Sequence, residues 1–282
     1  MASVPSERPA ARRRLLDIAE VPPHAKRAFY PSGYPSGPPR LSLLFELHNE
    51  TANVWSHLLP AIMMLGQLLD VISNPDVPLV ARSYVAVFEV TALFCFTASA
   101  MAHAYGAGTV LPPRQSAQLW SVDLMGISAV AAGAFVPGLR WGFRCWPRSQ
   151  AIYALASVSL VITAVLNARA PIGSAGNRRF IVAIVTAACL GMIAFVHWVS
   201  FASRRDLDDA FLPTLGMFTW FAIGFWAWKR QPFERLGAHK NPLYLGSHTA
   251  WHAAIAAGVA CWDSACRVML TRDWDTAHEC RQ

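Results

Sequence analysis

Two histidines, His248 and His252, stand four residues apart in an apolar stretch of this 282-residue chain. On a helix this spacing places both imidazoles on one face, one turn apart, where both can bind one metal ion. A third histidine, His103, lies near the end of another apolar stretch. Three protein ligands that leave a fourth position for water are typical of catalytic zinc sites. Histidines at this spacing also occur in ordinary buried hydrogen-bond networks, and the sequence leaves that alternative open.

Two further polar residues fall close to these histidines along the chain. Ser99 precedes His103 by four residues and shares its helix face, and Asp123 lies near the start of the next apolar stretch. We expect Asp123 to act as a general base or to orient a histidine. We expect Ser99 to hydrogen-bond a metal-bound water or to polarise a substrate carbonyl. These two residues are the candidate catalytic groups beside the three candidate zinc ligands.

Seven apolar stretches must position these residues. Each is about 18–23 residues long, enough for a helix to cross about 30 Å of hydrocarbon. Apolar residues make up 54% of the chain and charged residues only 15%, which excludes a disordered chain, an ordinary cytosolic enzyme and a coiled coil. The expected fold is all-α, a polytopic membrane protein with a seven-helix bundle. The expected spans are 55–73, 83–105, 118–139, 150–168, 180–201, 211–229 and 243–265.

The Lys and Arg residues predict how the chain is oriented. They lie in the gaps between apolar stretches rather than in one stripe, so the net charge of +7 indicates topology control and not nucleic-acid binding. Seven of the 24 basic residues fall in residues 1–40. We therefore expect the N-terminus in the cytoplasm and the C-terminus outside. The alternation of spans then places His103, Asp123 and the His248–His252 pair near the inner surface.

The sequence divides into three parts. Residues 1–40 are expected to form a flexible, basic, Pro/Gly-rich cytoplasmic arm, in which YPSG occurs twice in tandem. Residues 41–265 are expected to form the transmembrane domain, and residues 266–282 a short extracytoplasmic tail.

Three features of the expected spans lie outside the candidate zinc site. The polar residues around Trp55 favour a helix start with an interfacial Trp, with His57 joining a buried polar network as the alternative. Asp70 is expected to reach the outer interface. Glu89 is expected either in the core or in an outer cavity.

Four motifs in this order resemble the progestin and adipoQ receptor family. They are HNETANVWSHLLP at 48–60, SAMAH at 99–103, VDLMGIS at 122–128 and GSHTAWH at 246–252. The resemblance covers roughly residues 30–265 and implies a seven-helix membrane protein with a cytoplasmic N-terminus. The AMAH context and the GYPSGPPR arm are more similar to the membrane progestin receptor branch than to the adiponectin receptor branch. Bacterial haemolysin III-like proteins are related.

The resemblance also implies site residues, because the adiponectin receptors of this family resemble zinc-dependent ceramidases. It assigns zinc to His103, His248 and His252, places Asp123 beside the metal, and matches Ser99 to a serine one turn before the first ligand. The sequence departs from the adiponectin receptor pattern at three positions outside the ligand set. They are Gly108 in place of a second histidine, Leu124 in place of tyrosine and Thr249 in place of glutamine.

Three functions are therefore compared. The first is a receptor-like hydrolase of the plasma membrane that uses zinc to cleave a ceramide-like lipid amide. The second is a receptor for a lipid, a steroid or an extracellular protein hormone, in which zinc is structural. The third is a transporter that uses buried histidines as a proton relay, which is less favoured because the sequence has no evident internal repeat or paired half-helix breaks.

Overall fold

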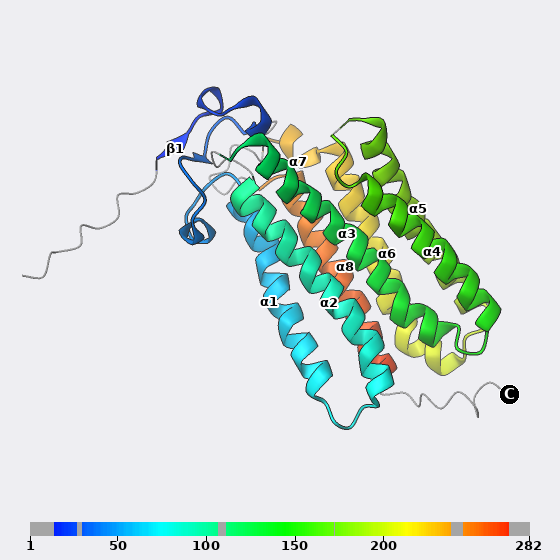
Figure 1. Ribbon diagram of the computed structural model, residues 1–282. Coiled ribbons are helices and arrows are strands. Elements are labelled where there is room, and N and C mark those ends of the chain that lie inside the picture. Colours follow the sequence, from blue (N-terminus) through cyan, green and yellow to red (C-terminus); the bar gives the residue numbers. More distant parts are fainter. Residues whose placement is uncertain (1–13, 27–29, 107–110, 172, 238–244, 271–282) are drawn as a thin grey trace, which may run out of the picture.

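The computed structural model describes residues 14–26, 30–106, 111–171, 173–237 and 245–270. Seven helices of this part are long and apolar enough to span a membrane, which confirms the predicted fold class. They lie side by side in one bundle (Figure 1). The helices are α1 Thr51–Ser73, α2 Leu79–Met101 with its continuation η4 Ala102–Gly106, α3 Pro113–Gly142, α4 Pro147–Asn167, α5 Ala175–Val199, α6 Arg204–Arg230 and α8 Ser247–Leu270.

Most helices extend beyond the predicted apolar stretches because their ends are polar. The first turn of α6 is an example: the side chain of Ser203 caps the helix by accepting a hydrogen bond of 3.1 Å from the Asp206 backbone N–H. Capped polar turns of this kind lie outside a hydropathy window although they are helical. Hydropathy therefore locates each span and underestimates its length.

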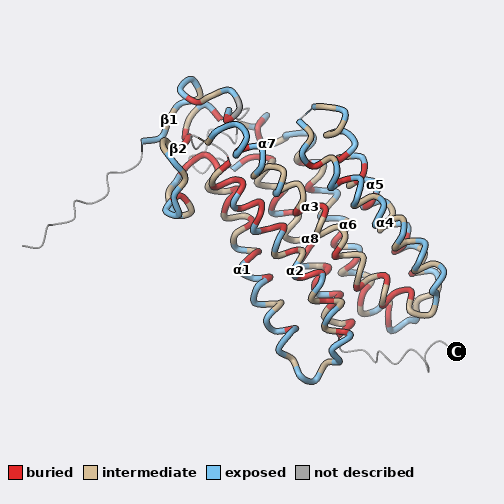
Figure 2. Tube along the Cα trace, in the orientation of Figure 1, coloured by how far each residue is buried: buried red, intermediate tan, exposed pale blue. Residues whose placement is uncertain are grey.

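The surface of the bundle is that of a protein surrounded by lipid. Large apolar side chains are exposed along the outward faces, among them Leu155 (71% exposed) and Leu166 (77%) on α4. Figure 2 shows these outer faces as exposed and the buried residues turned toward the bundle interior. An exposed apolar surface of this kind is favourable in hydrocarbon and unfavourable in water.

Small residues bring neighbouring helices close together. A Cβ atom added at Gly126 of α3 would lie 2.9 Å from the Cα atom of Cys95 on α2. On α6, a Cβ atom at Gly224 would lie 2.9 Å from the Cβ atom of Ala254 on α8. Helices in membranes associate through such close backbone contacts, since burial of apolar surface drives them together only weakly. These contacts fix α2 against α3 and α6 against α8.

The described part of the N-terminal arm folds over the end of the bundle where α1 begins (Figure 1). Strand β1 (Leu15–Leu16) pairs antiparallel with β2 (Tyr34–Pro35), and the Tyr34 side chain is fully buried. Three short 3₁₀ helices complete the segment: η1 Ile18–Glu20, η2 Pro23–Ala25 and η3 Leu41–Leu44. Residues 1–13 of the predicted arm lie outside the described residues.

A short helix, α7 (Pro232–Arg235), fixes the start of α8. Glu234 Oε1 accepts a hydrogen bond of 2.7 Å from the Ser247 backbone N–H, and Ser247 Oγ accepts one of 3.1 Å from the Phe233 backbone N–H. A carboxylate at this place also interacts favourably with the positive end of the α8 dipole. This contact sets the position of the helix that carries His248 and His252.

Arg267 joins three helices at the opposite end of the bundle. Its guanidinium donates to Asp70 of α1 (2.7 Å), to Glu89 of α2 (3.2 Å) and to Asp263 of α8 (3.0 Å). Asp70 and Glu89, which the sequence left without partners, are therefore both held by one arginine. The Asp263–Arg267 pair is spaced i,i+4, which favours helix. α8 accordingly runs to Leu270, five residues past the predicted limit of 265, and residues 271–282 of the predicted tail lie outside the described residues.

Candidate metal centre

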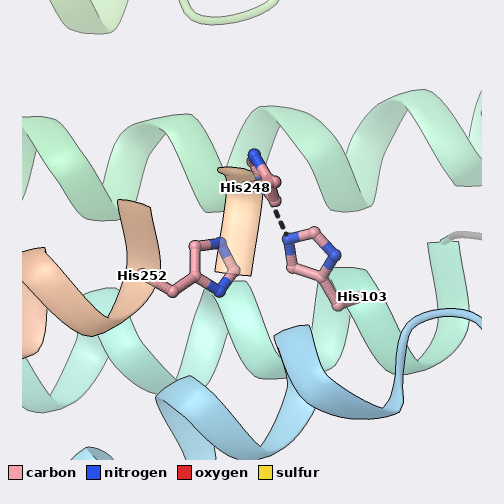
Figure 3. Close-up of side chains that lie close together, drawn as sticks. All are labelled: His103, His248 and His252. Carbon is pink, nitrogen blue, oxygen red and sulfur yellow. Dashed lines mark hydrogen bonds between the residues drawn. The ribbon is translucent and has the colours of Figure 1, made fainter. Parts of the chain in front are cut away.

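Three imidazoles meet where the start of α8 faces the end of α2. One ligand atom from each of His103, His248 and His252 can be chosen so that all three lie within 4.8 Å of one another. Figure 3 shows the three side chains close together, with His103 and His248 joined through their ring nitrogens. His103 is 1% exposed and His252 is 2% exposed. The structure therefore brings together the three histidines that the sequence assigned to zinc.

The local backbone of His103 is unusual. The residue lies in η4, a five-residue π-helical turn that continues α2. Turns of this type are rare and often occur at functional sites. The Trp120 ring of α3 packs edge-on against the His103 imidazole, with centroids 5.0 Å apart. The turn and the indole together hold the ring against the two histidines of α8.

The geometry of the cluster suits one small metal ion. The Nε2 atoms of His103 and His248 are 3.2 Å apart. Two imidazole ligands in a tetrahedral zinc site, each about 2.05 Å from the metal, are separated by about 3.3 Å. Neutral imidazole nitrogens are ligands that zinc and the neighbouring transition metals prefer. The donor atoms are of the kind that zinc prefers, and the closest pair has the spacing of two zinc ligands.

The start of α1 contributes a buried polar group that the sequence interpretation missed. His103 Nδ1 lies 2.8 Å from Glu50 Oε2, and the Asn53 side-chain amide donates to the same oxygen. Asn53 Oδ1 in turn accepts a hydrogen bond of 2.6 Å from the Thr249 hydroxyl. Glu50 and Asn53 are 2% and 3% exposed. α1 does begin here, at Thr51, as predicted, but its polar residues Glu50 and Asn53 are buried inside the bundle.

The same segment contacts the third histidine. His252 Nδ1 lies 3.0 Å from Ser56 Oγ and 3.2 Å from the backbone carbonyl oxygen of Asn53. The His57 ring stacks on the His252 ring with centroids 3.8 Å apart and an angle of 11° between the planes. His57 therefore lies among the buried polar residues, as in the alternative interpretation, but neither of its ring nitrogens has a hydrogen-bond partner among the described residues. The spacing 50, 53, 57 puts three polar residues on one helix face, which is the sequence signal for this group.

All five predicted site residues line one cavity of about 1300 Å³ inside the bundle. Ser99 is 1% exposed, and its Oγ has no hydrogen-bond partner among the described residues. Asp123 lines the same cavity from α3. The remaining lining is mostly apolar and comes largely from α3, α5, α6 and α8, with Phe135, Phe218 and Trp251 among its large residues. The imidazoles thus form one polar end of a large apolar chamber.

Comparison with known proteins matches most of the chain to one family. Residues 45–262 match the family described as haemolysin-III related. The chain is 26% identical over 224 residues to an adiponectin receptor protein of Drosophila melanogaster, covering 76% of this chain and 49% of the relative. It is 24% identical over 218 residues to progestin and adipoQ receptor-like protein 1 of Caenorhabditis elegans, covering 75% and 50%. The chain thus spans about half the length of these two relatives.

A plant relative is covered more completely. The chain is 26% identical over 283 residues to heptahelical transmembrane protein 1 of Arabidopsis thaliana, covering 93% of this chain and 82% of the relative. The name of that protein describes seven membrane helices, the number found among the described residues of this chain.

Proposed function

This chain belongs to the haemolysin-III-related family, which is the family of the progestin and adipoQ receptors, and we propose that it is a receptor-type lipid amide hydrolase. Zinc would be held by His103, His248 and His252. The observation that carries this proposal is the convergence of three buried imidazoles at the wall of a large intramembrane cavity.

The cavity supports a lipid as the substrate. At about 1300 Å³ it exceeds the range of about 300–1,000 Å³ of pockets for drug-sized ligands. Its apolar lining accommodates acyl chains, and its polar groups are gathered at the histidine end. An amphipathic molecule with an amide near one end and long hydrocarbon chains, such as a ceramide-like lipid, matches this distribution.

The cavity residues have separate roles in the proposed reaction, in which water cleaves the amide to a fatty acid and a free amine. When bound, zinc lowers the pKa of a coordinated water and acts as a Lewis acid. The Asp123 carboxylate accepts a proton from water and returns it to the departing amine nitrogen. The Ser99 hydroxyl, which has no partner among the described residues, donates a hydrogen bond to the amide carbonyl oxygen.

A second function is supported by the names of the relatives. The fly protein is named as a receptor and the nematode protein as receptor-like. In this alternative the same cavity binds a lipid or steroid, or responds to an extracellular protein hormone, and zinc only holds α2 and α8 together. We propose in both cases that the protein resides in the plasma membrane with its N-terminus in the cytoplasm.

Amide hydrolysis separates the two functions. Purified protein in lipid nanodiscs would be given a panel of N-acyl sphingosines, with release of fatty acid measured by mass spectrometry. Asp123→Asn is expected to keep its zinc and to lose turnover by about 10²–10⁴-fold, the contribution of a positioned general base. The control is Asp208→Asn, which makes the same change at an exposed carboxylate near the start of α6. This variant should retain turnover.

Two outcomes would contradict the hydrolase. One is full turnover by the Asp123→Asn variant, which would remove Asp123 from the reaction. The other is the absence of fatty acid release by zinc-loaded wild-type protein with every lipid in the panel, which would favour the non-catalytic receptor.

A further inference from the structure

The segment Glu50–His57, called here the α1 start segment, contacts two of the three clustered histidines. It meets both imidazole rings at the same atom, Nδ1. His103 Nδ1 meets Glu50 Oε2 at 2.8 Å, and His252 Nδ1 meets the Asn53 carbonyl oxygen at 3.2 Å. In both rings it is Nδ1 that α1 contacts, which leaves Nε2 to face elsewhere. The chemistry of these acceptors decides which nitrogen carries the proton.

The Glu50 carboxylate fixes the proton on His103. An ionised carboxylate has only acceptor sites, so the nitrogen facing it must donate. The Asn53 amide donates to the same Oε2 atom, which agrees with an acceptor at that position. With Glu50 ionised, the proton lies on His103 Nδ1, and Nε2 keeps its lone pair. That Nε2 atom is the one that lies 3.2 Å from His248 Nε2.

A backbone carbonyl performs the same task for His252. A carbonyl oxygen can only accept, so His252 Nδ1 donates to the Asn53 carbonyl or to the Ser56 hydroxyl beside it. Ser56 Oγ donates its own proton to the Asn53 carbonyl at 2.9 Å, which leaves the hydroxyl oxygen as an acceptor for the imidazole. The Nε2 atom of His252 is then also left with its lone pair.

We propose that the α1 start segment presets the metal centre, and that Glu50 is its principal positioning residue. This inference rests on the proposed metal binding by the three histidines. It adds that residues of α1 set the affinity of the site for the metal. The segment fixes Nε2 as the ligand atom of two histidines that come from two other helices. Glu50 also connects through Asn53 to Thr249 on α8, so one network orients rings on α2 and α8 from α1.

A carboxylate behind a histidine ligand has a known physical effect. It holds the ring in one orientation, fixes the tautomer and raises the basicity of the ligating nitrogen. Removal of such a partner lowers metal affinity by about 10–100-fold. Glu50 is 2% exposed and makes this contact from inside the bundle.

The test measures metal affinity directly. Purified metal-free protein would be titrated with zinc against a chromophoric chelator, and separately with cobalt to record the visible absorption of the bound metal. Glu50→Leu removes the acceptor and is expected to lower zinc affinity about 10–100-fold and to alter the cobalt spectrum. Glu50→Gln keeps an acceptor oxygen without the charge, so its affinity should lie between those of wild type and Glu50→Leu.

The matched control is Glu89→Gln, on the same helix as His103 but at the opposite end of the bundle and equally buried. It should leave zinc affinity unchanged. If Glu50 has a purely structural role, its substitution lowers the melting temperature of the metal-free protein but leaves the zinc affinity and the cobalt spectrum of the folded protein as in wild type. That result would overturn the inference. Absence of zinc binding by wild type would instead overturn the proposed function on which the inference rests.

Discussion

At the scale of single residues, the molecule contains two buried polar groups at opposite ends, and each is held together by a different chemistry. The histidine end is joined by imidazoles, one carboxylate and amide or hydroxyl groups from α1, α2 and α8. The other end is joined by Arg267 and three carboxylates from the same helices. Ionisable groups within a membrane are unfavourable unless paired. Arg267 pairs with all three carboxylates at its end, and Glu50 contacts His103 at the other. Both ring nitrogens of His57 are buried without a hydrogen-bond partner among the described residues.

The pairing at Arg267 has a measurable consequence. Arg267→Met leaves Glu89, which is fully buried, and Asp263 without their cation. Breaking a buried ion pair from one side destabilises a protein by about 3–5 kcal/mol, and the partial exposure of Arg267 favours the lower end of this range. For a chain of this size we expect the melting temperature in detergent to fall by about 6–12 °C.

Arg204→Met is the control for this substitution. Arg204 is 90% exposed and forms a surface pair with Asp208, so its removal should change the melting temperature by less than about 2 °C. An equal effect of the two substitutions would contradict a stabilising role for the buried pairs.

The sequence predicted the histidines but not the residues behind them. His248 and His252 share a helix face by their spacing alone, and His103 and Asp123 follow from the alternation of spans. Glu50 is different, because its contact with His103 joins residues 53 positions apart. Which face of α1 turns inward depends on how three helices pack, and local spacing does not contain that information. The shared face of positions 50, 53 and 57 groups these residues, but it does not show that this face turns toward His103.

At the scale of elements, the placement of the metal centre depends on how α8 begins. The helix starts at Ser247, one residue before His248, and its first N–H groups would otherwise lack acceptors. Glu234 from α7 supplies one of these acceptors. A short helix outside the seven spans therefore controls the register in which two of the three histidines enter the bundle.

Glu234→Ala tests this dependence. We expect a loss of about 0.5–2 kcal/mol, the usual effect of removing a helix-capping side chain. The loss should be concentrated at the cap, so hydrogen exchange of the backbone amides at 247–250 should become faster while exchange in the middle of α8 is unchanged. Glu234→Gln retains an acceptor oxygen and should restore most of the protection. Uniform acceleration along α8, or no change at Ser247, would contradict the capping role.

The helix ends were the part of the elements that the sequence predicted least well. The apolar stretches located all seven spans, since continuous hydropathy is required to cross hydrocarbon. The structure adds four residues before the first span and five after the last, and it begins the last span at Ser247 rather than at the predicted 243. At these ends, helix is stabilised by ion pairs, caps and neighbouring segments, such as Asp263–Arg267 in α8. Those interactions are side-chain contacts that a hydropathy average does not detect.

At the scale of the whole molecule, seven spans place the two ends of the chain on opposite sides of the membrane. The basic residues of the N-terminal arm favour the cytoplasm for that end. The histidine cluster lies at the end of the bundle where α1 begins, so this orientation puts the proposed metal centre near the cytoplasmic surface. A product or a conformational change at that centre would then reach intracellular partners directly.

Epitope tags at the two ends test the orientation. On intact cells we expect an antibody to reach a C-terminal tag, and to reach an N-terminal tag only after the membrane is permeabilised. A tag on a known cytoplasmic protein serves as the control for membrane integrity. The reverse labelling pattern would place the N-terminus outside, and the histidine cluster with it.

The central claim is that His103, His248 and His252 hold one zinc ion, and elemental analysis of the purified protein tests it most directly. Protein prepared without chelators should contain about one equivalent of zinc per chain, as expected for a single three-histidine site. His103→Ala, His248→Ala and His252→Ala should each lose this zinc, whereas His197→Ala, on α5 and outside the cluster, should retain it. Wild-type protein without metal, or a triple alanine variant that keeps its zinc, would contradict the claim.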